Sequence, residues 1–476
     1  MIAHWLTRFH PRYPRSLIYM MQASEYNIRD YLAWYNRTKD FLHVEKRKKL
    51  VKTPKALMLI GAAWLILLIL YGSAFGSWWI YPPPLRYIFF IVIMLQAPPL
   101  LAYILLIPLL AIRLLQMPAE YVIIKQAKHI LDNHKGMKIA IAGSFGKTSM
   151  REILKVVLSE GIRVAAPPSS YNTPLGISAF AKRLKGNEDA LLFEFGEYYP
   201  GDIRALCRIV KPRLGIITGV NEAHLQKFKH LERTAKTIFE LAEYLNGEPL
   251  YVNGESERAR AHAPKHAVMY TRLGAGNWKV EDPETDLSGT AFTLVKGQQR
   301  IRVKSRLLGL HHVGPLAAAS DIASRMGLSH RDIQKGIANT KPFDHRLQSH
   351  TDENGVVTLD DSYNGNPDGV RAVIAFLASL VNHRRFYVTP GLVEMGERTE
   401  TVHKEIGVQL AGAGIENVVL IKNSVTGYIE QGLKREGFAG KIVWFNDALS
   451  AFAALPHMTV KGDVVLLQND WPDQYQ

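Results

Sequence analysis

The stretch MKIAIAGSFGKTSMREILKVVL, Met137–Leu158, decides the fold that the sequence predicts. It opens with the apolar run Met137–Ala142, which is typical of a short buried strand. A glycine-rich turn follows, and after Ser149 apolar residues recur every three or four positions, as on one buried face of a helix. Five residues form this face: Met150, Ile153, Leu154, Val157 and Leu158. Strand, glycine-rich turn, Lys-Thr and helix are the order that a phosphate-binding loop needs.

The turn GSFGKTS carries the residue types that bind a nucleoside triphosphate. Gly143 and Gly146 allow backbone N–H groups to curl around phosphate oxygens, and the start of the following helix adds partial positive charge. Lys147 reaches the β- and γ-phosphates, and the Thr148 hydroxyl is a ligand for Mg²⁺. The general pattern has glycine where Ile141 stands, so this is a variant loop, and a purely structural turn is the alternative. The predicted nucleotide-binding residues of the loop are Gly143, Ser144, Phe145, Gly146, Lys147, Thr148 and Ser149.

The length and composition of the chain limit the number of domains and the classes of protein to which it can belong. A chain of 476 residues has room for two to four domains. Its 47% hydrophobic and 21% charged residues exclude a wholly disordered chain and a polytopic carrier. The single cysteine, Cys207, excludes a disulfide scaffold and a cysteine-based zinc site, and it fits a reducing compartment.

Much of the net charge of +15 lies beside an apolar region near the N-terminus. Residues 1–55 contain 12 Lys and Arg against 4 Asp and Glu, and the block Ala56–Ile80 has no charge. A second uncharged block, Tyr87–Ile112, contains prolines that we expect to kink it. Both blocks are long enough to cross a bilayer as helices, and the flanking positive charges put the N-terminus and everything after Arg113 in the cytoplasm. The alternative is that the two blocks are buried core helices. The basic residues favour binding to anionic lipid over binding to nucleic acid, or they act only as a topology signal.

Several motifs follow one another along the chain, beginning at the loop. They are AGSFGKTSMREIL, YNTPLGIS at 171–178, LLFEFGEYYPGDI at 191–203, GVNEAHLQKF at 219–228, YVNGE at 251–255, GLHHVGPLAAASDIA at 309–323, DDSYNGNPDGV at 360–370 and VEMGERTETVHKEIG at 393–407. In this order they resemble the Mur ligase family, most closely its members that add D-alanyl-D-alanine to a muramoyl tripeptide. The resemblance covers roughly residues 135–465.

The resemblance implies ATP and Mg²⁺ as cofactors and a set of site residues. Lys147, Glu194 and His224 are the expected catalytic residues, with Thr148, Glu194 and His224 as metal ligands. Beyond the loop, the expected nucleotide contacts are Asn253, His311, Arg346, Asp361, Asn364 and Asn366. Relatives also hold a second Mg²⁺ with a carbamylated lysine, but Ile238 stands at that position here. Lys236 is two residues away, about 200° around a helix, so it points to another face.

The predicted fold class is α/β, with a central phosphate-loop ATPase domain and a C-terminal Rossmann-like domain after two transmembrane helices. The expected divisions are 1–55 (basic cytoplasmic segment), 56–115 (transmembrane hairpin), 116–134 (linker), 135–340 (ATP-binding domain) and 341–476 (Rossmann-like domain). The family's UDP-gripping first domain is expected to be replaced by the hairpin.

Three functions fit these features. The first is a two-pass ligase of the inner (plasma) membrane with cytoplasmic catalytic domains. It would activate a carboxylate of a UDP- or lipid-linked cell-wall peptide precursor as an acyl phosphate and join it to an amino acid or D-Ala-D-Ala. The second resembles the poly-γ-glutamate synthetases, and the third is a nucleotide-binding membrane scaffold without catalysis, which Ile238 suggests. No nucleic-acid partner is expected.

Overall fold

The computed structural model describes residues 5–45, 49–168, 171–221, 230–363 and 365–469. The chain forms two compact units, one within Met1–Val122 and the other within Ile123–Trp471.

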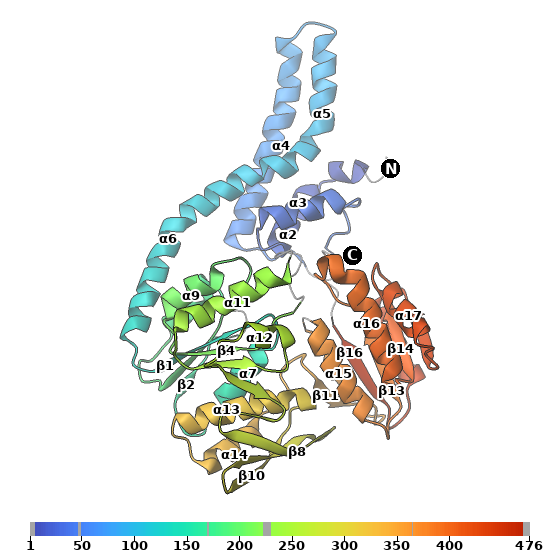
Figure 1. Cartoon of the computed structure of the whole chain (residues 1–476). Helices are drawn as coiled ribbons and strands as arrows, with labels where there is room; N and C mark the ends of the chain where they lie inside the picture. Colours follow the sequence, from blue (N-terminus) through green and yellow to red (C-terminus); the bar gives the residue numbers. More distant parts are fainter. Residues whose placement is uncertain (1–4, 46–48, 169–170, 222–229, 364, 470–476) are drawn as a thin grey trace. The chain divides into compact units, whose positions relative to one another are not determined.

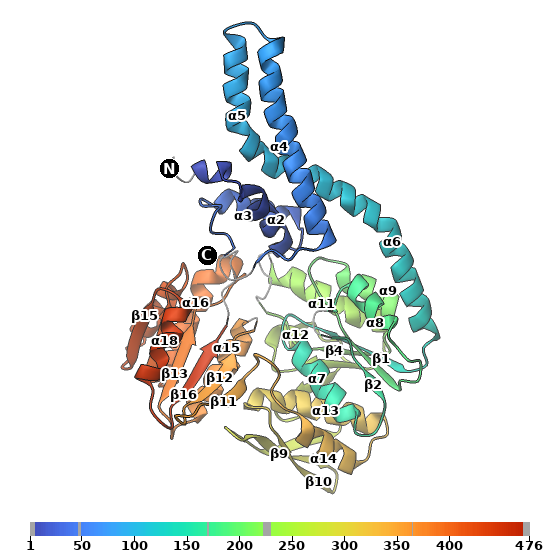
Figure 2. The ribbon, with the colours of Figure 1, turned by 180° about the vertical axis from the view of Figure 1, so that it is seen from behind.

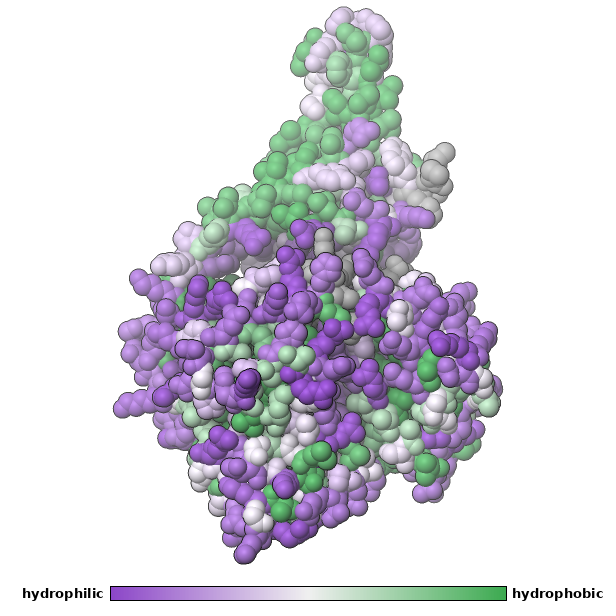
Figure 3. Space-filling view, in the orientation of Figure 1, coloured by the Kyte–Doolittle hydropathy of each residue, from purple (hydrophilic) through white to green (hydrophobic). Residues whose placement is uncertain are grey.

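The first unit is helical. Its long elements are α4 (Pro54–Ile80) and α5 (Leu85–Ile104), which run side by side as a hairpin (Figure 1). By length and composition, α4 and the apolar stretch Leu85–Asn133 are each able to cross a membrane. Their apolar side chains are mostly exposed, for example Leu68 at 69% and Phe75 at 61%, and this apolar surface covers the hairpin in Figure 3. A soluble core helix would bury such residues, so the exposure favours a lipid environment.

Residues before the hairpin fold into short helices, which the charge count alone did not predict. They form η1 (Thr7–Phe9), α2 (Tyr13–Ala23) and α3 (Ile28–Arg37). On α3, Tyr31, Trp34 and Tyr35 are buried, and the Tyr31 hydroxyl donates to the carbonyl of Ala102 at 3.0 Å. These aromatic side chains belong to one core with the N-terminal half of α4 and the C-terminal end of α5. The basic segment is therefore a folded part of the first unit.

The expected linker 116–134 is helical. The break in the apolar region lies at Leu105, between α5 and the long helix α6 (Leu106–Asn133). Pro108 has no N–H to donate to the carbonyl of Ile104, and its ring crowds that carbonyl, which explains an interruption there. The final turns of α6 bury Ala127 and Leu131 in the core of the second unit.

The second unit contains a ten-stranded sheet in the order β10-β9-β8-β7-β6-β5-β4-β1-β3-β2. Its parallel strands are β1 (Met137–Ala142), β2 (Val164–Ala165), β3 (Ala190–Glu194), β4 (Leu214–Ile217), β5 (Leu250–Asn253) and β6 (Val268–Thr271). The antiparallel strands are β7 (Gly274–Ala275), β8 (Trp278–Asp286), β9 (Gly289–Lys296) and β10 (Gln299–Ser305).

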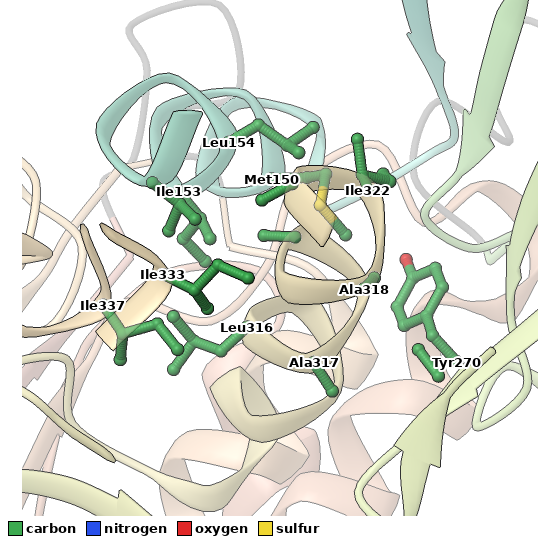
Figure 4. Packing of buried hydrophobic residues seen from close by; sticks show 14 of the residues in the cluster. Met150, Ile153, Leu154, Tyr270, Leu316, Ala317, Ala318, Ile322, Ile333 and Ile337 are labelled. Atoms are coloured by element: carbon green, nitrogen blue, oxygen red, sulfur yellow. The ribbon is translucent and has the colours of Figure 1, made fainter. Parts of the chain in front are cut away.

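Helices cover both faces of the parallel strands. One core contains side chains of α7 (Lys147–Leu158), α13 (Val313–Arg325) and α14 (His330–Asn339), and Figure 4 shows its packing. The opposite core contains α8 (Pro174–Ala181), α9 (Asp202–Val210) and α11 (Leu231–Leu245); α12 (Glu257–His262) adds Ala259. All five residues of the apolar face expected on α7 are buried.

A second, six-stranded sheet follows, in the order β11-β12-β16-β13-β14-β15 (Figure 2). The strands are β11 (Gln348–Thr351), β12 (Val357–Asp361), β13 (Arg385–Thr389), β14 (Asn417–Ile421), β15 (Lys441–Phe445) and β16 (Val464–Gln468). All pairs except β11–β12 are parallel. Side chains of α15 (Pro367–Ser379), α16 (Thr399–Gly412) and α17 (Thr426–Arg435) pack in one core, and α18 (Ala448–Met458) packs in another. The α/β fold class is therefore confirmed.

Replacing Ile333 by Ala should lower the free energy of unfolding by about 2–5 kcal/mol, because it empties space in the core between α7 and α14. Chemical denaturation of the purified chain measures this loss. Leu273, which is 79% exposed, is the matched control, and Leu273→Ala should change stability by less than about 0.5 kcal/mol. Equal effects of the two substitutions would contradict the packing described here.

Candidate nucleotide site

The phosphate-loop sequence connects β1 to α7 at the carboxyl edge of the parallel strands. Gly143 and Gly146 have positive φ angles of 143° and 76°, and a Cβ atom on Gly143 would collide with the Thr218 hydroxyl. That hydroxyl donates to the carbonyl oxygens of Phe145 and, at 3.2 Å, Ala142. The loop is thus fastened to the end of β4, and glycine is required where the two segments meet. Ile141 lies inside β1, fully buried, which explains an apolar residue there.

Lys147, the first residue of α7, is held by a carboxylate that the sequence analysis did not single out. Its Nζ donates to Glu197 Oε1 at 3.0 Å and Oε2 at 2.9 Å, and also to the carbonyl of Gly143. The Glu197 side chain is only 2% exposed, against 14% for Lys147. The available signal was the second glutamate of the EFGE motif, three residues after Glu194.

Thr148 and Glu194 lie together, as the resemblance implied. The Thr148 hydroxyl donates to Glu194 Oε2 at 3.1 Å, and Arg151 Nη1 lies 2.8 Å from Oε1. Arg151 is a second residue that the sequence analysis missed, although it occupies the next turn of the same helix. The side chains of Glu194 and Arg151 are 7% and 3% exposed, so both charges are buried as a pair.

This arrangement fits Mg²⁺. Hydroxyl and carboxylate oxygens are the hard ligands that Mg²⁺ prefers, and Mg²⁺ commonly takes few protein ligands because water and phosphate oxygens complete its octahedron. Among the described residues, Glu194 Oε1 accepts no well-directed hydrogen bond, although Arg151 Nη1 is its ionic partner at 2.8 Å. The same part of the chain contains no group of three or more His, Cys, Asp or Glu placed to hold a metal. Among the described residues, Thr148 and Glu194 are the two expected ligands that the structure brings together, and they would hold the ion.

Two predicted asparagines, Asn253 and Asn366, are each linked to the loop through one intermediate residue. Asn253 Nδ2 donates to the carbonyl of Thr218 at 2.9 Å. Asn221, which the sequence analysis did not select, donates from its backbone to Ser144 Oγ at 3.3 Å and from Nδ2 to Asn366 Oδ1 at 2.8 Å. Asn366 also caps α15, so Asn221 joins the phosphate loop to the start of a C-terminal helix.

The other described candidates form separate local groups. Asp361 Oδ1 accepts from the backbone N–H of Leu347 at 3.2 Å, and the Arg346 guanidinium lies 5.1 Å from the centroid of the Tyr363 ring. Burial raises the pKa of Asp361 to about 7, although the nearby Arg346 opposes the change. The ring of His311 lies 4.1 Å from that of His312, centroid to centroid, at a tilt of 43°. Burial lowers the pKa of His311 to about 4, so it is neutral at physiological pH.

His224 and Asn364 lie outside the described residues. Ile238 of α11 is fully buried in the core that this helix packs against, whereas Lys236 on the same helix is exposed. The expectation that Lys236 points to another face is confirmed. Residue 238 is thus an apolar core residue in this chain.

Together, the fold and the site define a nucleotide-binding enzyme of the phosphate-loop class, with a Rossmann-like domain after it. Two family models match: the Mur ligase middle domain over residues 141–323 and the Mur ligase glutamate ligase domain over residues 345–468. The chain belongs to the Mur ligase family. It is an ATP-dependent ligase with ATP and Mg²⁺ as cofactors, which confirms the predicted enzyme class.

Named relatives agree on one branch of the family. The UDP-N-acetylmuramoyl-tripeptide–D-alanyl-D-alanine ligase of Mycobacterium leprae is 28% identical over 69% of this chain and 70% of its own length. That of Mycobacterium bovis is 29% identical over 60% of this chain, which spans 58% of the relative. A MurF structure from Thermotoga maritima, in complex with ADP, has a TM-score of 0.64 at 23% identity and covers 74% of this chain and 80% of its own.

The stability of wild type relative to Asp361→Asn should depend on pH. A raised pKa means that the folded chain keeps a proton which the unfolded chain releases above about pH 4. The free energy of unfolding of wild type should therefore fall by up to about 1.4 kcal/mol per pH unit until about pH 7. The Asp361→Asn variant lacks this fall. Its free energy of unfolding, measured relative to that of wild type, should therefore rise between about pH 4 and pH 7 and then level off. Thermal unfolding between pH 4 and 8 measures the difference, and parallel curves would contradict the assignment.

Proposed function

We propose that this chain joins the amine of D-Ala-D-Ala, or of a similar amino acid or dipeptide, to a carboxylate of a muramoyl-peptide precursor. The observation that carries the proposal is the pairing of Thr148 with the buried Glu194 beside Lys147 at the start of α7. The choice of substrates is supported by the names of the relatives, which are D-alanyl-D-alanine ligases.

In the proposed reaction the substrate carboxylate attacks the γ-phosphorus of ATP and becomes an acyl phosphate, with ADP as leaving group. The amine then attacks the acyl carbon, and inorganic phosphate leaves. Negative charge crowds around phosphorus in the first step, so charge neutralisation and alignment are what the protein contributes. Mg²⁺, when bound, neutralises part of the phosphate charge.

Each side chain has a part in this scheme. The Lys147 ammonium stabilises charge on the transferring phosphoryl group, and Thr148 and Glu194 hold the cation. Arg151 holds Glu194 in place and offsets its charge, because Nη1 lies 2.8 Å from Oε1 in a buried position. His224 remains a candidate ligand for a second cation; with Ile238 in the core, that cation has no carbamylated lysine at residue 238.

We propose further that α4 and α5 anchor the enzyme in the plasma membrane, with both catalytic domains on the cytoplasmic side. Support comes from the two apolar helices and from the basic residues that precede them. The domain divisions at 135–340 and 341–476 belong to the same proposal. Such an anchor would keep the active domains near precursors that are lipid-linked.

The reaction is tested by incubating the purified full-length chain in detergent with ATP, Mg²⁺, D-Ala-D-Ala and either a UDP-linked or a lipid-linked muramoyl tripeptide. Phosphate release that depends on both substrates, together with a product mass increased by one dipeptide less water, supports the proposal. Release with glutamate and a glutamate polymer instead would support a synthetase of poly-γ-glutamate. Nucleotide binding without turnover on any substrate would support a scaffold.

Lys147→Ala should lower substrate-dependent phosphate release at least about a hundredfold, because one cation at the reacting phosphate typically contributes several kcal/mol. The rate under saturating substrates is the measurement. Lys155→Ala, three residues from the end of the same helix and 46% exposed at its side chain, is the matched control and should retain activity. Near wild-type turnover in Lys147→Ala would overturn the role given to this residue.

The intact chain should stay with membranes through washes in 1 M salt and in alkaline carbonate, because apolar helices, unlike charge contacts, are not screened by salt. Immunoblotting of pellet and supernatant measures the distribution. Full release by salt would show that the hairpin does not span the bilayer, and it would leave the ligase reaction untouched.

A further inference from the structure

Glu197 has no assigned role in the reaction described above, yet it is the direct ionic partner of Lys147. Both of its oxygens lie within 3.0 Å of Nζ, and the side chain is 2% exposed. The chain around it is tied down: the N–H of Gly196 donates to the carbonyl of Asn172, and the N–H of Tyr198 donates to Asp202. A carboxylate buried on such a short, fastened segment does not turn away into water.

The buried charges at the start of α7 cancel before any nucleotide arrives. Lys147 and Arg151 supply two positive charges, and Glu194 and Glu197 supply two negative charges. All four side chains are less than 15% exposed, so water screens them weakly. Arg151 also pairs with Glu152, whose side chain is 22% exposed. A nucleotide therefore brings its phosphate charge into a site that has no net positive charge and no spare cation among these groups.

This balance has different consequences for the two forms of a nucleotide. Metal-free ADP needs Lys147 as a counter-charge, and sharing Lys147 leaves the buried Glu197 beside phosphate oxygens of the same sign. A nucleotide that carries Mg²⁺ brings two positive charges of its own, so Lys147 can serve the phosphates and Glu197 together. The ammonium has three N–H donors, which makes such sharing possible.

We propose that Glu197 is a specificity-determining residue that makes the site select the Mg²⁺-bound nucleotide over the metal-free one. It does so by competing with the phosphates for Lys147. The inference rests on the nucleotide binding of the proposed function and deepens it. Its consequence is that the site does not fill with a nucleotide that lacks the cation needed for phosphoryl transfer.

The test measures the dissociation constant of ADP by titration calorimetry, with excess Mg²⁺ and with EDTA, on the purified full chain in detergent. Wild type should bind Mg²⁺–ADP more tightly than metal-free ADP. In Glu197→Gln, metal-free ADP should bind about tenfold more tightly than it does to wild type, because one buried like charge is removed while the side-chain shape is kept. Binding of Mg²⁺–ADP should change less than about threefold.

Two further variants separate charge from shape. Glu197→Asp keeps the charge and should keep the wild-type preference for Mg²⁺–ADP. Glu243→Gln removes a carboxylate that is 64% exposed on the surface, and it should leave both dissociation constants unchanged. Thermal unfolding of each variant checks that it is folded. If Glu197→Gln does not fold, the binding preference of Glu197→Asp becomes the test.

Three results would overturn the inference: an unchanged preference in Glu197→Gln, a lost preference in Glu197→Asp, or a selective loss of Mg²⁺–ADP binding in Glu197→Gln. The last result would make Glu197 a metal ligand instead. If wild type binds neither form of ADP, the proposed function itself fails. If wild type binds ADP and only the variants depart from expectation, the proposed function stands and this inference fails.

Discussion

The structure of the site depends on the parallel pairing of β1 between β3 and β4. In this register Ile141 pairs with Glu194 on one side, and Ala142 pairs with Ile217 on the other. The phosphate loop, the carboxylate of Glu194 and the hydroxyl of Thr218 therefore leave the sheet at the same edge. A shift by one residue would turn alternate side chains to the opposite face and would separate Glu194 from Thr148.

Buried charge is the second constraint, and it follows from the first. The end of β3 and the segment after it place the carboxylates of Glu194 and Glu197 next to the start of α7, where an isolated ionised group would be costly. Lys147 and Arg151, one turn apart on that helix, offset them. The cost of burying these charges is repaid as a preorganised site, because the groups need little rearrangement when phosphate binds. The same four residues thus offset one another's charge in the absence of nucleotide, and under the proposed function Lys147 and Glu194 also act on the phosphates and the cation.

Local patterns predicted much of this fold. The β1 strand and the buried face of α7 both follow from the apolar pattern of Met137–Leu158. Glu194 was expected from the resemblance, which rests in part on the motif LLFEFGEYYPGDI at 191–203. Glu197, Arg151 and Asn221 were not found, because their roles arise from pairings across 50, 43 and 145 residues of sequence. Likewise, the core of the first unit is built by aromatic residues whose packing partners lie in α5, beyond the reach of local spacing.

The central claim is that this chain activates a carboxylate by phosphorylation, and an isotope measurement tests it most directly. The muramoyl tripeptide is labelled with ¹⁸O in its terminal carboxylate and incubated with the purified chain, ATP, Mg²⁺ and D-Ala-D-Ala. An acyl phosphate requires one labelled oxygen to appear in each inorganic phosphate released, as detected by mass spectrometry. Phosphate without label would show that water attacks ATP in this enzyme, and it would contradict the account.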